Sequence, residues 1–589
     1  MVAFRSKHTQ GVGNPKPDTL VLLLLAAWWV VNLLQAALTG LANDEAYYWY
    51  FSQHLDWGYF DHPPMVALLV RLSSWLPGAL GIRFLPTLLQ PLYLLLFWHI
   101  IRPADATRRD AVLYVLLCFS QPLLQLYGFL AVPDAPLMFF TVAFLWTYKR
   151  FRESATLPNA LLMGIAVALL GYSKYHGALV VLLVLLSDLR LFRRWQLYVA
   201  GLTALLLFLP HLWWQYTHDW VSFGYHLAGR NAWAYKPGFT FEYIALLLTI
   251  FNPLWLYHYW CGIADSRRIG VPLRNALLWL AAGFALFFLL STVRGSVQPQ
   301  WVLPVALPLT AMLFHASRRS RYVRTAAIVF AVLFIAVRVV AVTNPIGLKG
   351  ELWNQEQTYA QIADLAGDRP VVFMQNYTAP AKYTYYTGRT AYCSPYFYTR
   401  HSQWQYDTLD RTFRGREVIV GNLNNNVQKE SLALADGRIF HYSVIDDYMP
   451  LRELEVECLT PLDLALPYLR RDSLATQADS LAPVVLTLAV RNPYHFDVYS
   501  TDSMPVRLQL YFHVTQHYAA GAFGLLADTL RAGTVTVIEQ PIVLPPDLDE
   551  GVHTAGFAIG PAGYDPAGNS PTFNAAVRHS RDTLFITKQ

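Results

Sequence analysis

The stretch LVLLLLAAWWVVNLLQAALTGLANDEAYYW (Leu20–Trp49) decides how the chain is interpreted. Its apolar first part is long enough to cross a bilayer as one helix. Two adjacent carboxylates, Asp44 and Glu45, follow at once, and aromatic residues come directly after them. Acidic groups where a chain leaves the membrane are costly unless they are solvated or paired, so they indicate a functional site. Aromatic rings there suit the interface and can also stack on a sugar or cover a lipid.

The composition divides the chain into two parts. Apolar residues make up 54% of the 589 residues and charged residues only 14%, which is low for a soluble protein and indicates a large membrane part. Residues 1–343 carry a net charge of +13 and residues 344–589 a net charge of −7. A basic membrane part therefore precedes an acidic soluble part. Cys393 and Cys458 lie in the soluble part, and the sequence leaves open whether they pair.

Apolar runs of spanning length predict about eleven membrane helices. They lie near residues 19–42, 84–101, 111–131, 135–148, 158–173, 177–189, 196–213, 241–262, 275–293, 300–316 and 325–343. The first run is long, and no small-residue cleavage site follows it before Asn43, so we expect it to remain as a span rather than to be a signal peptide.

The loops between these runs alternate in charge. One set contains nineteen Lys and Arg residues, whereas the other contains only Arg71, Arg83, Lys174, Arg230, Lys236 and Arg294. Basic loops stay in the cytoplasm, so we expect a cytoplasmic amino terminus and an extracytoplasmic carboxyl-terminal part at the inner (plasma) membrane. The outer loops hold most of the acidic residues, including Asp61 and Asp134, which places the expected active site on the outer face.

The outer part is predicted to be structured. We expect an interfacial helix over 44–54, a break at Asp61-His62-Pro63-Pro64, and an amphipathic helix over 65–76. Residues 344–454 show a mixed α/β pattern with a buried strand over 370–374. Strand-like segments at 484–490, 506–514, 534–542 and 553–559 predict a β-sandwich over 455–589.

Six motifs resemble one family of membrane glycosyltransferases. They occur in order as Asn43-Asp44-Glu45-Ala46-Tyr47-Tyr48-Trp49, Asp61-His62-Pro63-Pro64, Arg83-Phe84-Leu85-Pro86, Pro133-Asp134-Ala135-Pro136, Ser173-Lys174-Tyr175 and Gly295-Ser296-Val297-Gln298-Pro299-Gln300-Trp301. Together they resemble the polyprenyl-phosphate-sugar glycosyltransferases of the protein O-mannosyltransferase and aminoarabinose lipid A transferase superfamily (glycosyltransferase family 39-like), which has the GT-C fold. The resemblance covers the membrane part only.

This resemblance implies an activity and a set of roles. It implies an inverting transferase that moves a hexose or pentose from a polyprenyl-phosphate donor to a lipid, glycan or protein acceptor at the outer face. Nucleic acid is not an expected partner, and no cofactor is expected. It implies Asp44 as the base, with Glu45 beside it and Asp134 as a second outer carboxylate. The resemblance also implies that Arg83, Lys174 and Arg294 bind the departing lipid phosphate, because cationic side chains suit phosphate oxygens. The candidates for substrate contact are Tyr47, Tyr48, Asp61, His62, His176, Gln298 and Trp301.

Each of these residues also has a plainer structural explanation. Asp44-Glu45 and Asp134 can cap helices, and the three cations can anchor the chain at the interface. His62 can be a turn residue, and the tyrosines can be packing. His54, Asp56 and His62 could bind a divalent metal together with Asp44 or Asp61, although no tight ligand spacing favours it.

Two other functions compete with the transferase. A transporter or flippase for a lipid-linked glycan would place charges near the midplane and repeat its halves, but the acids gather at one face and no internal repeat is visible. A membrane-anchored adhesion module would leave the outer carboxylates without a role. The sequence leaves the sugar, the acceptor and the lipid length open.

Overall fold

The computed structural model describes residues 16–229, 235–318, 320–374, 376–394, 402–423, 430–459, 466–467, 484–514, 517–520, 524–526, 529–542, 551–561, 567–568, 573–578 and 583–587. Arg230, which the charge pattern placed in an outer loop, lies outside these residues, as do the first basic residues of the chain. The chain forms two compact units, 1–39 with 48–348 and 40–47 with 349–589. We call them the helical unit and the sheet unit.

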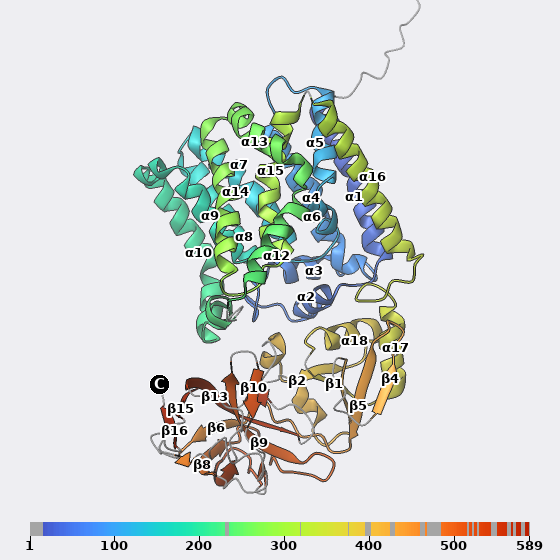
Figure 1. Ribbon diagram of the computed structural model, residues 1–589, viewed down its shortest axis with the longest axis vertical. Coiled ribbons are helices and arrows are strands. Elements are labelled where there is room, and N and C mark those ends of the chain that lie inside the picture. Colours follow the sequence, from blue (N-terminus) through green and yellow to red (C-terminus); the bar gives the residue numbers. More distant parts are fainter. Residues whose placement is uncertain are drawn as a thin grey trace, which may run out of the picture. The chain divides into compact units, whose positions relative to one another are not determined.

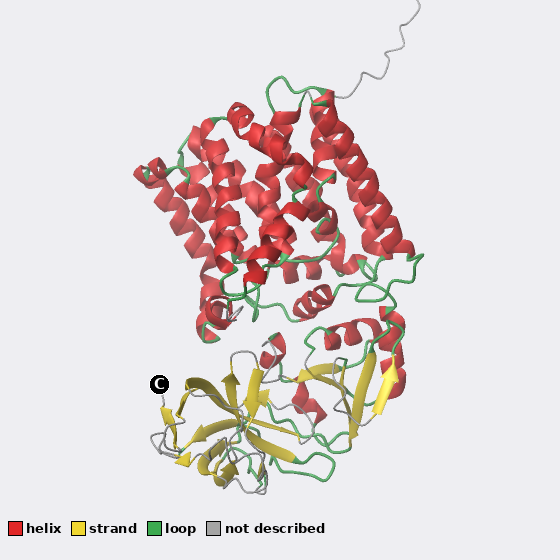
Figure 2. Cartoon of the chain, in the orientation of Figure 1, coloured by secondary structure: helices red, strands yellow, loops and turns green. Residues whose placement is uncertain are grey.

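The helical unit is built from the apolar runs of the sequence (Figures 1 and 2). Its long helices are α1 (Pro17–Leu38), α4 (Leu80–Ile101), α7 (Asp134–Glu153), α8 (Leu157–Ser173), α10 (Trp195–Thr217), α14 (Val271–Ser291) and α16 (Arg321–Thr343). Five of the described helices, namely α1, α4, α10, α14 and α16, are long and apolar enough to cross a membrane. Shorter helices include α9 (His176–Leu186), α12 (Pro237–Ile250), α13 (Leu256–Asp265) and α15 (Ala306–Ser317).

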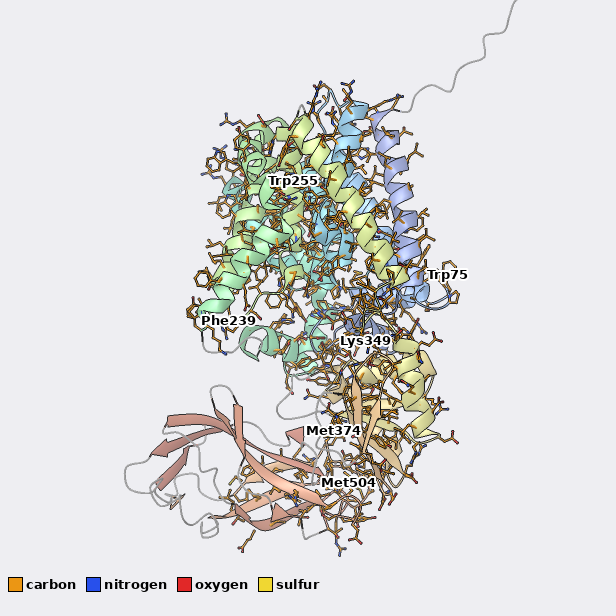
Figure 3. The ribbon with its side chains drawn as sticks, turned by 45° about the vertical axis from the view of Figure 1, so that its right-hand side comes forward. Trp75, Phe239, Trp255, Lys349, Met374 and Met504 are labelled. Carbon is orange, nitrogen blue, oxygen red and sulfur yellow. The ribbon has the colours of Figure 1, made fainter. Side chains whose placement is uncertain are left out.

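Two of the predicted spans are interrupted. The run over 111–131 divides into α5 (Arg108–Phe119) and α6 (Pro122–Leu126), because Pro122 has no N–H to continue the first helix. The run over 241–262 stops at Asn252, which adopts a left-handed backbone with φ 54° directly before Pro253. The chain then resumes as the short 3₁₀ helix η3 (Pro253–Trp255) and α13. Figure 3 shows Trp255 at this break, inside the bundle, whereas Trp75 is 70% exposed.

A buried polar network holds α16 against the rest of the helical unit. Arg338 donates from Nη1 to Asn32 Oδ1 at 2.9 Å, and its guanidinium lies 4.6 Å from the ring centroid of Trp28. Asn32 and Trp28 both donate to Gln90 Oε1, at 2.7 and 2.9 Å. Because polar groups in an apolar environment are costly without partners, these bonds fix α16 to α1 and α4, although most of its surface is exposed.

The loop over residues 43–83 has the predicted elements. Helix α2 runs from Asn43 to Gln53 and α3 from Met65 to Ser73, and the chain between them breaks at the two prolines as expected. Tyr59 donates from its hydroxyl to Phe51 O and to His54 O, both at 3.0 Å. The Tyr59 ring stacks on Phe51 at 4.1 Å between centroids. The loop is therefore a packed part of the protein.

The first part of the sheet unit is a mixed α/β layer. Strands β1 (Val371–Met374), β2 (Ala391–Ser394) and β3 (Val418–Asn422) are parallel, and β5 (Ile439–Ile445) and β4 (Glu430–Ala433) extend the sheet antiparallel in the order β2-β1-β3-β5-β4. Helices α17 (Gln355–Ala366) and α18 (Ala379–Thr387) pack on it through residues such as Tyr359, Ile362 and Tyr383. The predicted buried strand over 370–374 is confirmed as β1.

The second part of the sheet unit is antiparallel. One sheet has the path β10-β9-β13-β15-β16-β7, with β11 on β9 and β14 on β13, and a smaller sheet has the order β12-β8-β6. Its main strands are β6 (Glu455–Cys458), β8 (Val484–Arg491), β9 (Val506–Val514), β12 (Val535–Ile542), β13 (Gly551–Pro561), β15 (Phe573–Arg578) and β16 (Thr583–Thr587). The short strands are β7 (Leu466–Pro467), β10 (His517–Ala520), β11 (Gly524–Leu525) and β14 (Ala567–Gly568). Cys393 and Cys458 are both free thiols.

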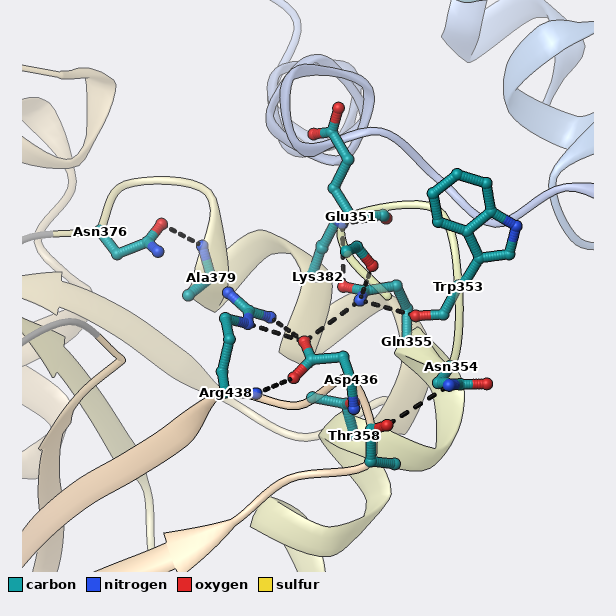
Figure 4. A network of polar contacts seen from close by, with 12 residues as sticks. Glu351, Trp353, Asn354, Gln355, Thr358, Asn376, Ala379, Lys382, Asp436 and Arg438 are labelled. Carbon is teal, nitrogen blue, oxygen red and sulfur yellow. Dashed lines mark hydrogen bonds and ion pairs between the residues drawn. The ribbon is translucent and has the colours of Figure 1, made fainter. Parts of the chain in front are cut away.

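A buried lysine lies at the centre of a polar network in the sheet unit (Figure 4). Lys382 is fully buried and donates to Glu351 O at 2.8 Å and to Gln355 Oε1 at 3.0 Å. Gln355 Nε2 in turn donates to Asp436 Oδ2 at 3.3 Å, and the same carboxylate pairs with Arg438 at 2.6 Å. The network joins α17, α18 and the turn before β5.

Burial lowers the pKa of Lys382 to about 7, because the charged amine loses its hydration. Arg438 lowers it further, whereas Glu351, Glu45 and Asp436 oppose the shift. The unfolded chain keeps this proton up to the ordinary value of 10.5. Between these values the unfolded state binds more protons, so the free energy of unfolding should rise with pH, by up to about 1.4 kcal/mol per pH unit.

We expect Lys382→Met to remove this dependence. Thermal unfolding of the full chain in detergent should show the stability of the wild type rising relative to that of the variant as the pH is raised from about 7 to 9. A difference between the two proteins that stays constant over this range would show that Lys382 does not titrate there.

Candidate active site

A buried ion pair joins two of the predicted site residues. Lys174 Nζ donates to both carboxylate oxygens of Asp134 at 2.8 Å, and the two residues are 5% and 2% exposed. Asp134 is the first residue of α7. Lys174 is the residue at which α8 ends. The pair therefore ties the start of one helix to the end of the next, and Lys174 is not a snorkelling residue.

Beside this pair lies a pocket of about 360 Å³ in the helical unit. It is lined by His62, Lys174, Tyr175, His176, Leu179, His226, Leu227, Phe287, Phe288, Ser291, Arg294 and Trp301. Two cations and three imidazoles thus share a cavity with a wall of apolar and aromatic side chains. Such a lining suits a ligand with an anionic group and an apolar part.

The imidazoles are held by neighbouring elements. His62 Nε2 lies 3.1 Å from the hydroxyl of Tyr48. His226, from the π-helical turn η2 (Tyr225–Gly229), lies with Nε2 2.9 Å from Asp61 O. His176 is the first residue of α9, and its ring lies against Phe288 at 5.4 Å between centroids. The sequence had pointed to His62 and His176 but not to His226.

The aromatic wall comes from the last predicted motif. Trp301, 7% exposed, lies in the 3₁₀ helix η5 (Pro299–Val305) and its ring is 5.6 Å from that of Phe288. Arg294 is exposed and donates from Nη1 to Leu227 O at 3.0 Å. Gln298 accepts a bond from Gln300 Nε2 at 2.9 Å, and it does not belong to the lining of this pocket.

Arg83 has a different environment. Its side chain is fully buried, and Nη1 donates to Ala36 O, Thr39 O and Thr39 Oγ1 at 2.8, 2.9 and 3.1 Å. These acceptors lie at the carboxyl end of α1, where a cation is favourable. Phe129 lies 5.8 Å from the guanidinium. The structure thus brings Lys174 and Arg294 to one pocket and places Arg83 at the end of α1.

The two adjacent carboxylates belong to the sheet unit and differ in exposure. Glu45 is fully buried, and its Oε2 accepts a bond from Ala42 N at 3.0 Å, as in the second half of a capping box. Asp44 is partly exposed and accepts a bond from Tyr377 at 3.1 Å between the hydroxyl and Oδ1. Tyr47 and Tyr48 are buried, at 1% and 5% exposure. Of the two acids, Asp44 is the one that a substrate can reach.

Metal binding was an alternative for the histidine and aspartate residues of the outer loop. Within the part of the chain that the structure describes, no three His, Cys, Asp or Glu side chains gather as a metal site would require.

Comparison with known proteins places the chain in a fold class. The structure of ArnT from Cupriavidus metallidurans in the apo state matches with a TM-score of 0.56 at 14% identity, over 72% of this chain and 97% of that one. The same protein bound to undecaprenyl phosphate matches with a TM-score of 0.52 at 15% identity, over 72% and 98%. The chain is therefore a membrane-spanning helical protein of the GT-C fold.

Sequence relatives support the same class. A family model described as dolichyl-phosphate-mannose-protein mannosyltransferase matches residues 61–214. Lipid A galacturonosyltransferase RgtD of Rhizobium johnstonii is 26% identical over 313 residues, which are 49% of this chain and 63% of that protein. Lipopolysaccharide core galacturonosyltransferase RgtA of the same organism is 30% identical over 211 residues, or 33% and 41%. The chain thus spans less than two thirds of either relative, and the predicted resemblance to GT-C glycosyltransferases is confirmed.

The Lys174–Asp134 pair yields a testable expectation. Lys174→Met or Asp134→Leu alone takes the ion-pair partner from a buried charge, which typically costs about 3–5 kcal/mol of stability. The double variant Lys174→Met/Asp134→Leu should recover most of this loss, because no charge is then left buried. Thermal unfolding in detergent measures the stability of the single and double variants. Strictly additive losses in the double variant would show that the two side chains do not interact.

Proposed function

We propose that this protein is an inverting glycosyltransferase that moves a sugar from a polyprenyl-phosphate donor to a lipid or glycan acceptor at the outer face of the inner membrane. The observation that carries the proposal is the pocket in which Lys174, fixed by Asp134, and Arg294 face an aromatic wall. A lipid phosphate has the matching chemistry, an anionic group on an apolar chain.

In this proposal the reaction is a single displacement. The acceptor oxygen attacks the anomeric carbon, the bond from that carbon to the phosphate oxygen breaks, and the phosphate leaves with the electron pair. Asp44 takes the acceptor proton, and Lys174 and Arg294 neutralise the charge that develops on the departing phosphate. Asp134 orients Lys174, a role that its two bonds to the ammonium favour over that of a second base.

The relatives suggest which substrates to test first. The matched relatives are a lipid A galacturonosyltransferase and a lipopolysaccharide core galacturonosyltransferase, and one matched structure has undecaprenyl phosphate bound. We therefore propose a lipopolysaccharide-type acceptor, with undecaprenyl-phosphate galacturonic acid, aminoarabinose and mannose as the donor panel. A protein acceptor is the second choice, because the matching family model describes a protein mannosyltransferase.

Replacing the proposed base is the direct test of the chemistry. Asp44→Asn preserves size, so the fold and donor binding should persist, whereas transfer to a hydroxyl acceptor should fall by about 10²-fold or more. A phosphate acceptor is already ionised and should show a milder loss. Product formation by the purified protein in nanodiscs, followed by mass spectrometry, measures this. Full transfer to a hydroxyl by a folded variant would exclude Asp44 as the base.

A flippase for a lipid-linked glycan is the alternative function. Such a protein would move the donor between leaflets without releasing free polyprenyl phosphate. Release of undecaprenyl phosphate that depends on the acceptor therefore favours the transferase, and lipid movement without release favours the flippase.

The topology is tested separately. We propose eleven spans with a cytoplasmic amino terminus, because basic loops alternate along the chain. A periplasm-active reporter fused after Asn344 should be active, and the same reporter fused after Arg194 should be inactive. Equal activity at both positions would contradict the proposed topology and the outer-face site with it.

A further inference from the structure

The segment Gly40–Tyr47, which we call the acidic segment, is held by other parts of the sheet unit at several points. Leu41 N donates to the Tyr386 hydroxyl, and Asn43 N donates to Glu351 Oε2, each at 3.0 Å. At Gly40 the backbone approaches Leu352 so closely that a Cβ would lie 2.6 Å from its carbonyl oxygen. The backbone on the amino-terminal side of Asp44 therefore has little freedom.

Helix α18 and the loop before it make most of this support. Tyr386 and Lys382 lie one turn apart on α18 and therefore on the same face. Tyr386 accepts the bond from Leu41 N. Lys382 donates to the carbonyl oxygen of Glu351 (Figure 4), and the carboxylate of Glu351 accepts the bond from Asn43 N. One helix thus anchors the acidic segment both directly and through Glu351.

Tyr377 reaches the proposed base itself. Its hydroxyl lies 3.1 Å from Asp44 Oδ1, and its ring meets the ring of Tyr47 edge-on at 4.8 Å between centroids. Tyr47 accepts a bond from Gln403 N at 2.6 Å. Tyr377 therefore contacts the acidic segment at two residues, one of which is the partly exposed carboxylate.

The position of Tyr377 is fixed by its own surroundings. Asn376 holds the turn that leads into α18, because its Oδ1 accepts bonds from Thr378 N at 3.1 Å and Ala379 N at 3.0 Å (Figure 4). The buried indole of Trp404 donates to Tyr377 O at 2.7 Å. A residue held on both sides in this way can keep its hydroxyl directed at one carboxylate oxygen.

We infer that Tyr377 is a positioning residue for Asp44, and that the sheet unit supplies it. The inference rests on the proposed role of Asp44 as base. The Tyr377 hydroxyl occupies Oδ1 and fixes the rotation of the carboxylate, which leaves Oδ2 to accept the acceptor proton. A carboxylate free to rotate would spend less time in the productive orientation, and misorientation lowers turnover more than binding.

The first test compares two tyrosines. Tyr377→Phe keeps the ring and its contact with Tyr47, so we expect kcat to fall by about 10-fold, on the scale of a hydrogen bond to a charged group. The KM for undecaprenyl-phosphate galacturonic acid should change by less than about 2-fold. Tyr494→Phe is the matched control, because it loses a bond of similar length, 3.0 Å from Glu453 N, away from the acidic segment. A wild-type kcat in Tyr377→Phe would overturn the inference.

The second test does not depend on catalysis. In thermal unfolding, the shifts of Tyr377→Phe and Asp44→Ala should not add, because both remove the same bond. Additive shifts would show that the contact does not exist in the protein. If Tyr377→Phe folds poorly, 3,5-difluorotyrosine at position 377 preserves the ring and hydroxyl but ionises at lower pH. The kcat of the difluorotyrosine protein should then fall as the pH rises, because the hydroxyl loses the proton that it donates to Asp44. The kcat of the wild type should not fall over the same pH range.

The outcomes separate this inference from the proposed function. If Asp44→Asn retains full transfer, Asp44 is not the base and the proposed mechanism fails. If Asp44→Asn loses transfer but Tyr377→Phe turns over like the wild type, the mechanism stands and the positioning role is wrong. Loss in both variants with no further loss in the double variant supports both.

Discussion

The ion pair between Lys174 and Asp134 is the constraint on which the proposed site depends. Two charges buried at 5% and 2% exposure are tolerated only as a pair. Their bond therefore fixes the end of α8 against the start of α7. The same bond holds the ammonium at the pocket that also contains Arg294 and three imidazoles. A free lysine would be hydrated or flexible, whereas this one presents its charge at a fixed point, which is what stabilisation of a leaving phosphate requires.

The sheet unit contains the acidic segment, which carries the proposed base. Asp44 lies within this unit, together with the tyrosine and the helix that support it. The buried charges around Lys382 give α17 and α18 a common polar core, and Glu351 extends that core to Asn43. The sheet unit therefore fixes the conformation of the acidic segment.

Local sequence patterns predicted the elements well. Each of the eleven apolar runs contains helix, and the helices near Asp44 and Met65 and the strands near Val371 and Val506 lie where expected. The breaks at Ser120–Pro122 and Asn252–Pro253 could have been anticipated from proline alone. The eleven-span topology and the boundary at 454–455 stay predictions.

The partnerships of the site residues could not be predicted in the same way. Asp134 and Lys174 are 40 residues apart, and Asp44 and Tyr377 are 333 apart, so no local period connects them. In the sequence, Arg83 has the same pattern as Lys174 and Arg294, a single cation in a loop expected on the outer face. Its guanidinium nevertheless donates to the backbone at the carboxyl end of α1. His226 was missed because a single histidine in a loop has no pattern, and only the tertiary fold brings it to the pocket.

The most direct measurement is a cryo-electron microscopy structure of the full chain in nanodiscs with undecaprenyl phosphate. We expect density for the phosphate within hydrogen-bonding distance of both Lys174 and Arg294, with the isoprenoid chain leading away along apolar surface. A phosphate bound elsewhere in the helical unit, with this pocket empty, would contradict the assignment of the pocket to the lipid donor.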